Sequence, residues 1–195
     1  MVNRAIVTIS VMITLVNMSC SQNRNYLTEQ EKAWNPYKEG QILVFGAVDG
    51  HTDTLVITKA EDKRFPDGIG ALQNERLRVL VRVNDPGISK KSIEVMLLYI
   101  FSKTVKDLSE ISFEIPLAGG RFWGKPYSFD KLDKYEEFSL QTPYGKFDDV
   151  IRIGDNSDQV FRENDIATIF WSKSVGYIKC EKKDGTIWEL LDIQK

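Results

Sequence analysis

The stretch "VGYIKCEKKDGTIWELL", residues 175–191, decides the fold of this chain, because it predicts two β-strands joined by a tight turn. Side chains in a strand alternate between its two faces, so Ile178 and Cys180 share one face of the first strand. Trp188 and Leu190 likewise share one face of the second strand. Each strand therefore has one apolar face, and the stretch predicts a β-hairpin whose two apolar faces contact the same core.

The turn between these strands supports the same hairpin. If both apolar faces contact one core, Cys180 must lie opposite Trp188, and that pairing leaves Lys183 to Gly185 as the loop. A three-residue loop ends on a residue in the left-handed conformation, which glycine adopts without steric cost. Strand pattern and turn chemistry thus predict one register, and Cys180 is expected to be a small buried hydrophobe.

The same two-residue period continues upstream. In "ERLRVLVRV", residues 75–83, the apolar face is formed by Leu77, Val79, Val81 and Val83. Further β-rich runs, each bounded by Gly, Pro, Asn or Asp, bring the total to about ten strands. No helical pattern separates them, so the sequence predicts a mainly β fold over a single domain at residues 41–195. The expected architecture is an antiparallel sandwich or a partly open barrel.

Residues 20–40 are polar and precede this β-rich domain. Thr28 to Glu31, "TEQE", matches a capping box, in which the Thr and Glu side chains bond the free backbone N–H groups at the start of a helix. Asn35-Pro36 ends such a helix, because the residue before a proline is disfavoured in the helical conformation. We expect a tether that contains one short helix.

The N-terminus holds an apolar run that ends at a cysteine. Residues 5–18 include ten apolar residues in fourteen. A membrane-spanning helix needs about 20 apolar residues, so this run is too short to span and matches the central region of a secretory signal. Ser19-Cys20 resembles the processing site of a bacterial lipoprotein signal, which implies removal of residues 1–19 and a lipid anchor, and hence membrane attachment, at Cys20. The alternative is ordinary cleavage after Ser21, which would discard the cysteine.

A second resemblance covers residues 144–190, approximately the C-terminal quarter of the chain. "YGKFDDVIRI" and the hairpin that follows resemble the C-terminal half of small envelope lipoproteins of Bacteroidota. The matching positions are Gly145, Phe147, Asp149, Val150, Trp171, Ser172, Val175, Gly176, Tyr177, Ile178 and Lys179. Most of those families are uncharacterised β-rich domains. The resemblance therefore implies export, lipidation and the fold, and carries over no catalytic residue.

Charge and composition exclude several classes of function. The chain has 26 basic and 28 acidic residues, which gives a formal net charge of −2. This balance provides no long-range attraction to polyanions, so we expect no nucleic acid partner. A single histidine excludes any zinc site that needs two, and the sequence has no glycine-rich phosphate loop or serine nucleophile motif. We therefore expect no metal, no cofactor and no enzymatic activity.

Two loops carry residue types that bind metals. His51 lies between Asp49 and Asp53, a combination that could form a metal or acid–base site. Residues 154–158, "GDNSD", offer oxygen ligands of the kind that calcium prefers. Both stretches are also rich in residues that form turns, and a solvated turn is the interpretation that the sequence favours in each case.

Three arginines share the polar face of residues 75–83. Arg76, Arg78 and Arg82 could bind an anionic headgroup or an acidic sugar. The favoured interpretation is a solvated outer face on which the arginines pair with Glu94 or Glu114.

The stretch "GGRFWGKPY", residues 119–127, is the strongest candidate for a binding site. Phe122, Trp123 and Tyr127 could form an aromatic platform for a sugar ring, with hydrogen bonds from Arg121 or Lys125. The alternative, which the pattern favours, is that these aromatic side chains close one end of the β core.

These observations together predict a lipid-anchored, non-catalytic protein of the cell envelope with a binding or structural role, whose partner could be a glycan or an envelope protein. "SQNRN", residues 21–25, contains no acidic residue. In Bacteroidota, acidic residues just after the anchor cysteine are associated with surface export, so the resemblance implies a domain that faces the periplasm. The alternatives are a surface glycan-binding lipoprotein, a periplasmic lipid carrier and, least favoured, a hydrolase.

Overall fold

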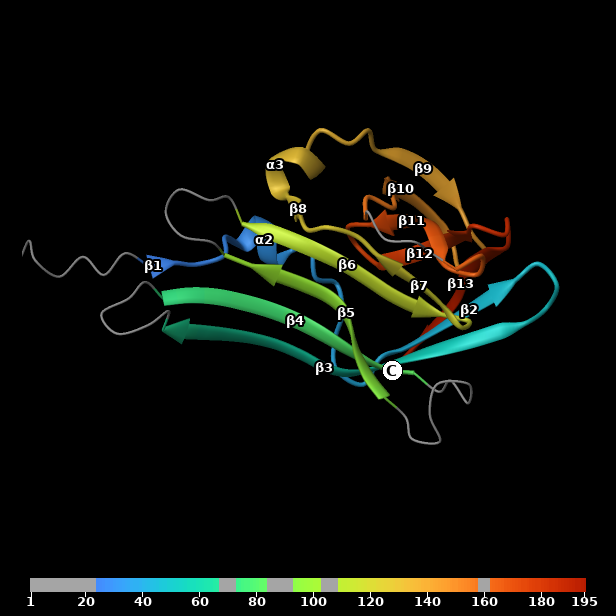
Figure 1. The fold of residues 1–195 in the computed structure, drawn as a ribbon, viewed down its shortest axis with the longest axis horizontal. Helices are drawn as coiled ribbons and strands as arrows, with labels where there is room; N and C mark the ends of the chain where they lie inside the picture. Colours follow the sequence, from blue (N-terminus) through green and yellow to red (C-terminus); the bar gives the residue numbers. More distant parts are fainter. Residues whose placement is uncertain (1–23, 67–72, 84–92, 103–108, 158–161) are drawn as a thin grey trace, which may run out of the picture.

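The computed structural model describes residues 24–66, 73–83, 93–102, 109–157 and 162–195 (Figure 1). These residues form a 13-stranded sheet and two four-residue helices. The elements are β1 (Arg24–Asn25), α2 (Glu29–Lys32), β2 (Ile42–Ala47), β3 (Thr52–Pro66), β4 (Gln73–Val83), β5 (Ile93–Phe101), β6 (Glu110–Leu117), β7 (Gly120–Trp123), β8 (Tyr127–Ser128), α3 (Phe129–Leu132), β9 (Phe138–Gln141), β10 (Lys146–Gly154), β11 (Ile166–Ser172), β12 (Gly176–Lys182) and β13 (Ile187–Gln194).

The sheet curls into a partly open barrel. Its strand order is β7-β6-β5-β4-β3-β2-β13-β12-β11-β10-β9, with β1 beside β4 and β8 beside β6. The long strands β3 to β6 form one wall and β10 to β13 form the other (Figure 1). Strand β7, at one end of the order, lies against β11. The predicted mainly β fold is confirmed, and of the two expected architectures, a sandwich or a partly open barrel, the structure has the second. The sequence suggested fewer strands because β1, β7 and β8 are too short to show a two-residue period.

Strand β4 shows why these residues form a sheet with one buried face. Leu77, Val79 and Val81 are buried, whereas Arg76 and Arg82 are exposed. The strand pairs along its length with β3 and with β5, both antiparallel. The apolar alternation in the sequence therefore corresponds to the concave and convex faces of the curled sheet.

The C-terminal hairpin has the predicted register. Cys180 pairs with Trp188, and the Gly185 backbone has φ of 87°. The Lys182 N–H donates to the Thr186 carbonyl oxygen at 2.9 Å and closes the three-residue loop. Cys180 is completely buried, as expected for a small hydrophobe on the core face.

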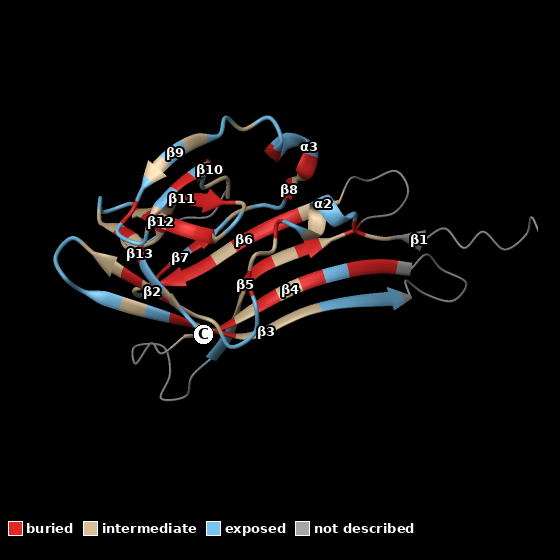
Figure 2. Cartoon of the chain, turned by 180° about the vertical axis from the view of Figure 1, so that it is seen from behind, coloured by how far each residue is buried: buried red, intermediate tan, exposed pale blue. Residues whose placement is uncertain are grey.

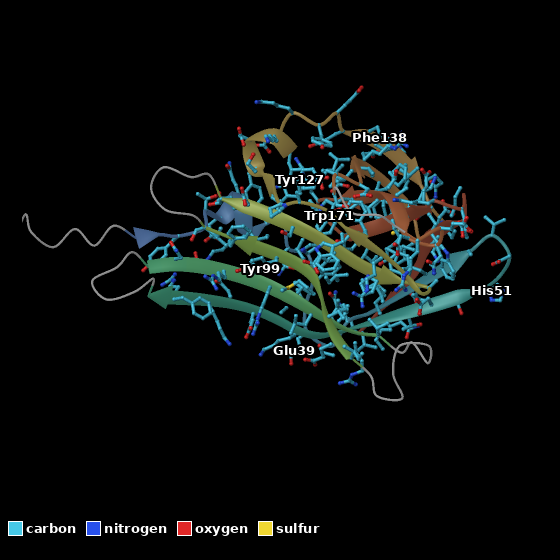
Figure 3. All side chains as sticks on the ribbon, viewed as in Figure 1. Glu39, His51, Tyr99, Tyr127, Phe138 and Trp171 are labelled. Atoms are coloured by element: carbon cyan, nitrogen blue, oxygen red, sulfur yellow. The ribbon has the colours of Figure 1, made fainter. Side chains whose placement is uncertain are left out.

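An aromatic cluster fills the space between the two walls. The Trp171 ring lies 4.9 Å from both the Phe113 and the Tyr177 ring centroids. Tyr37 packs edge-on against Trp171 at 5.9 Å. Buried positions follow β4, β6, β11 and β12 in Figure 2, and Figure 3 shows Trp171 and Tyr127 among the side chains between the walls. Aromatic packing across the concave face therefore holds the walls together.

The segment after β1 packs into this core rather than standing apart from it. Helix α2 has the predicted capping box, in which the Glu31 N–H donates to Thr28 Oγ1 and the Thr28 N–H to Glu31 Oε2. Trp34 and Tyr37, which follow the helix, are buried in the hydrophobic core. The described part of the expected tether is thus a structural part of the domain.

The apolar run, Cys20 and the predicted signal at residues 1–19 lie outside the described residues. Within the described ranges, neither helix has the length and apolar content that a membrane span requires.

Candidate functional site

The structure divides the four candidate residues of the 119–127 stretch between two faces. Burial alternates along β7, so Phe122 points into the core while Arg121 and Trp123 point outward. Phe122 is 1% exposed and Tyr127 7% exposed, against 49% for Trp123. The four side chains therefore do not form one platform, because neighbouring strand positions face opposite sides. Phe122 and Tyr127 close the core, which was the favoured alternative, whereas Arg121 and Trp123 reach the surface.

Tyr127 has a structural role in this arrangement. Its hydroxyl donates a hydrogen bond to the Gly154 carbonyl oxygen at 2.9 Å. Its ring packs edge-on against Phe113 and Tyr135, at centroid distances of 6.0 and 6.5 Å. Burial raises the pKa of Tyr127 well above its ordinary value, so the hydroxyl stays protonated and continues to donate.

The two outward side chains of β7 border a hollow of about 200 Å³, here called the Trp123 hollow. Its lining consists of Val95, Met96, Glu114, Ile115, Pro116, Arg121, Phe122 and Trp123. Strand register explains the assembly, because Glu114 pairs with Trp123 and Pro116 pairs with Arg121 across β6 and β7. The hollow is smaller than the 300–1,000 Å³ or so that holds a drug-sized ligand, so it suits one small group or one unit of a longer ligand.

Glu114 gives the Trp123 hollow its polar chemistry. Burial raises the pKa of the Glu114 carboxyl above its ordinary value, and the nearby Arg121 guanidinium partly opposes that rise. The rise favours the neutral carboxyl, and a neutral carboxyl can donate as well as accept a hydrogen bond. An aromatic ring, a guanidinium and a carboxyl around one apolar hollow are a combination that can bind a sugar ring.

Contacts on three sides hold β7 and its turn in place. The Ala118 N–H donates to Asp53 Oδ2 at 2.6 Å, and Lys182 Nζ donates to the Ala118 carbonyl oxygen at 2.8 Å. The Arg121 N–H donates to Asp165 Oδ1 at 3.1 Å. A Cβ on Gly120 would lie 2.0 Å from the Asn164 carbonyl oxygen, so glycine is required there. The site is thus built on a fixed strand.

The loop around His51 is a turn. The His51 N–H donates to Asp49 Oδ1 at 3.1 Å, and Asp53 accepts from the Thr54 and Ala118 N–H groups. The Asp53 carboxylate is thereby engaged with the backbone. Among the described residues, no group of three or more His, Cys, Asp or Glu side chains is arranged to hold a metal ion.

The loop that begins at Gly154 also has the structure of a turn over its described part. Asp155 Oδ1 accepts from the Ser157 N–H at 2.9 Å, and Asn156 Oδ1 accepts from the Lys125 N–H at 2.6 Å. Asp158, the last residue of the proposed calcium loop, lies outside the described residues. The Asp155 bond stabilises the turn itself, and the Asn156 bond attaches the turn to the chain that follows β7.

The three arginines of β4 lie on the outer face and differ in their partners. Arg78 forms an ion pair with Glu61, on β3, whereas Arg82 stands opposite Glu94 in the backbone register of β4 and β5. Arg76 instead lies over the Phe65 ring, 5.1 Å from its centroid. Charge pairing with Glu94 or Glu114 was expected for this face, and the ion pair that the structure shows is with Glu61 instead, through the register of β3 with β4.

Cys180 is not a candidate for chemistry. Burial raises the pKa of its thiol far above the ordinary value, which keeps the sulfur neutral. Complete burial also separates it from any reagent in solvent.

Sequence reasoning missed one charged cluster at the start of β4, here called the Glu75 cluster. Glu75 is 1% exposed and its carboxylate accepts from the Leu27 N–H at 2.9 Å, from Lys32 Nζ at 2.8 Å and from Arg64 Nε at 3.3 Å. The signal was present, because Glu75 shares strand parity with Leu77 and is the one charge on that apolar face of residues 75–83. The cluster binds the N-terminal segment to the sheet.

Comparison of the chain with known protein families, with curated proteins and with solved structures finds no match.

Proposed function

We propose that this chain is a non-catalytic binding protein of the bacterial cell envelope, anchored in the membrane through lipidated Cys20 and facing the periplasm. The apolar run that ends at Cys20 supports the anchor. The burial of Cys180 supports it as well, because a thiol enclosed in the core is a poor partner for a disulfide with Cys20.

The observation that carries the binding role is the exposure of Trp123. The Trp123 side chain is 49% exposed on a strand that is held in place by contacts on three sides. Its apolar ring is in contact with solvent and forgoes the stabilisation that burial would give the fold. Arg121 and Glu114 stand beside it with hydrogen-bonding groups. A sugar ring combines an apolar face with hydroxyls, so we propose a glycan as the ligand class of the Trp123 hollow.

A lipid carrier and a hydrolase, the two other candidate functions, receive less support from the geometry. A lipid carrier needs an apolar chamber, and between the described walls that space is occupied by the aromatic cluster around Trp171. A glycoside hydrolase needs two carboxyl groups about 5–10 Å apart across the substrate, and Glu114 is the one carboxyl group that lines the hollow.

The intact mass of the protein extracted from its native membrane tests the anchor. We expect a chain that begins at Cys20 and carries acyl mass, and we expect the acyl mass to be missing from the Cys20→Ala variant. An unmodified chain that begins at Gln22 would show instead that the protein is secreted without an anchor.

Binding to a panel of soluble glycans, measured by isothermal titration calorimetry, tests the ligand class. Trp123→Ala should weaken binding at least about fivefold, since ring stacking contributes about 1 kcal/mol or more. Tyr144→Ala removes another exposed aromatic side chain, on the β9–β10 turn, and is the matched control that should bind normally. If no glycan binds the wild type, or if both variants lose binding equally, the proposed ligand class is wrong.

A further inference from the structure

The outer face of β3, β4 and β5 carries a second cleft, of about 330 Å³, which shares Met96 with the lining of the Trp123 hollow. It is lined by Glu61, Lys63, Phe65, Arg76, Arg78, Met96 and Tyr99. Cationic and aromatic side chains predominate in this lining, and we call it the basic cleft.

Positive charge exceeds negative charge around the basic cleft. Lys59, Lys63 and Arg78 share a single carboxylate, that of Glu61, with Lys59 Nζ at 3.2 Å and Lys63 Nζ at 2.7 Å from its Oε2 atom. The Lys63 hydrogen bond is the main reason that the pKa of Glu61 falls to about 2, so Glu61 remains ionised. One carboxylate cannot neutralise three cations, and the surplus is available to an external anion.

Arg76 adds a fourth cation that is not neutralised by Glu61. Within the described ranges it pairs with no carboxylate, and its guanidinium lies over the Phe65 ring. Phe65 is 38% exposed, and the Tyr99 and Phe101 rings stack beside this face at a centroid distance of 5.1 Å. Exposed aromatic rings beside cations are typical of protein surfaces that contact the headgroup region of a bilayer.

The position of the basic cleft points to the same partner. Arg24 in β1 pairs with Gln73 at the start of β4, and Lys63 pairs with Arg76 three residues further along β4, a distance of about 10 Å. Cys20 precedes Arg24 by four residues, which span at most about 14 Å. An acyl anchor at Cys20 therefore enters the membrane close to this end of the sheet. The β2–β3 turn with His51 lies at the opposite end (Figure 3).

We propose that the basic cleft is a membrane-contact surface, on which Lys63 and Arg76 bind the phosphates of anionic lipid headgroups and Phe65 enters the interface. This proposal rests on the proposed anchor for the orientation of the domain. It adds a contact made by the folded domain itself. This contact would hold the basic cleft on β3 and β4 against the bilayer and direct the end of the sheet with the β2–β3 turn into solvent.

Vesicle co-sedimentation of the mature chain, residues 20–195 with Cys20→Ala, tests the surface without any acyl group. We expect the chain to bind vesicles that contain phosphatidylglycerol and to bind pure phosphatidylcholine vesicles weakly, with the difference lost at high salt. Replacing both Lys63→Gln and Arg76→Gln should weaken binding about thirtyfold, and either change alone about fivefold. Thermal unfolding followed by circular dichroism verifies that each variant is folded.

The matched control makes the same change of charge on the other wall. Lys146→Gln with Arg152→Gln removes two exposed cations of β10 and should change binding by less than about threefold. Equal binding to both kinds of vesicle, or an equal loss in this control, would overturn the proposal. Saturable binding of inorganic phosphate without vesicle binding would also overturn it, because the cleft would then be a site for a small anion.

This experiment separates the two proposals. The Cys20→Ala chain carries no lipid, so its vesicle binding reports on the basic cleft alone. An unacylated native protein would contradict the anchor while leaving the vesicle result valid, and failure of the vesicle experiment would leave the mass of the native protein unchanged.

Discussion

Replacing Glu75 by glutamine should weaken the attachment of the N-terminal segment to the rest of the domain, because it removes the charge at the centre of the Glu75 cluster. The side chain keeps its shape, and its remaining carbonyl oxygen can still accept from the Leu27 N–H. The bonds from Lys32 and Arg64 change most, because each cation then meets a neutral amide instead of a carboxylate. We expect Glu75→Gln to destabilise the protein while the sheet still forms.

The structure sets the size of this effect. Breaking a fully buried ion pair costs about 3–5 kcal/mol, but Lys32 also bonds Asp62 at 2.9 Å and the Arg64 side chain is exposed. Glutamine moreover leaves no unpaired charge in the core. We therefore expect the free energy of unfolding to fall by about 2 kcal/mol, a large part of the 5–15 kcal/mol or so that is typical of a domain.

Urea unfolding followed by tryptophan fluorescence is the assay, since Trp34 lies in the segment concerned. Glu137→Gln is the control, because it makes the same chemical change in the surface ion pair of Glu137 with Lys173, 2.6 Å apart. Surface pairs contribute about 0.2–1 kcal/mol, so the control should lose less than half as much stability.

The pH dependence provides a second test of the same reasoning. Burial by itself would raise the pKa of Glu75, but the hydrogen bonds from Lys32, Leu27 and Arg64 and the Lys32 charge outweigh it, and the pKa falls below its ordinary value. The stabilisation is then present above the unfolded pKa and is lost as the pH falls through the folded pKa. The difference between wild type and Glu75→Gln should shrink below about pH 4. A difference under about 0.5 kcal/mol at neutral pH, or one that is constant with pH, would refute the role of the Glu75 charge.

Two further predictions concern the core. Gly176 has φ of 94°, and a Cβ there would lie 2.0 Å from the Tyr37 hydroxyl oxygen, so Gly176→Ala should lower the free energy of unfolding by about 3 kcal/mol or more. A Cβ on Gly145 would meet no atom within 4 Å, so Gly145→Ala should lower it by less than about 1 kcal/mol. Urea unfolding measures both losses. Equal losses in the two variants would contradict this account. Cys180 in the Cys20→Ala chain should resist a thiol reagent until denaturant is added, because the thiol is buried and its pKa is raised. Rapid labelling of the folded chain would show that the hairpin opens.

Much of the fold was determined by the sequence alone, because the information is local. A strand alternates its faces every two residues, so the apolar positions of residues 75–83 identified the core face without reference to any partner. The register of Cys180 with Trp188 followed from the two apolar faces and the loop length, and Gly185 supplied the conformation that the loop needs. The capping box of α2 is likewise contained in four consecutive residues.

The candidate site was predicted in part. The stretch 119–127 was identified from its composition, but its division into core and surface residues depends on strand β7, which is only four residues long. Once β7 is known, alternation places Arg121 and Trp123 outside. Their neighbour Glu114 joins them only through the pairing of β6 with β7.

Contacts between distant segments were decided by the tertiary structure. The Tyr177 N–H donates to the Tyr37 hydroxyl across 140 residues of sequence, and Glu75 accepts from the Leu27 N–H across 48. The curl of the sheet brings these groups together and places the basic cleft near the start of the chain. Local periodicity describes which face of a strand is apolar. It does not describe how strongly the sheet bends or which segment covers its concave face, because those follow from packing of the whole core at once.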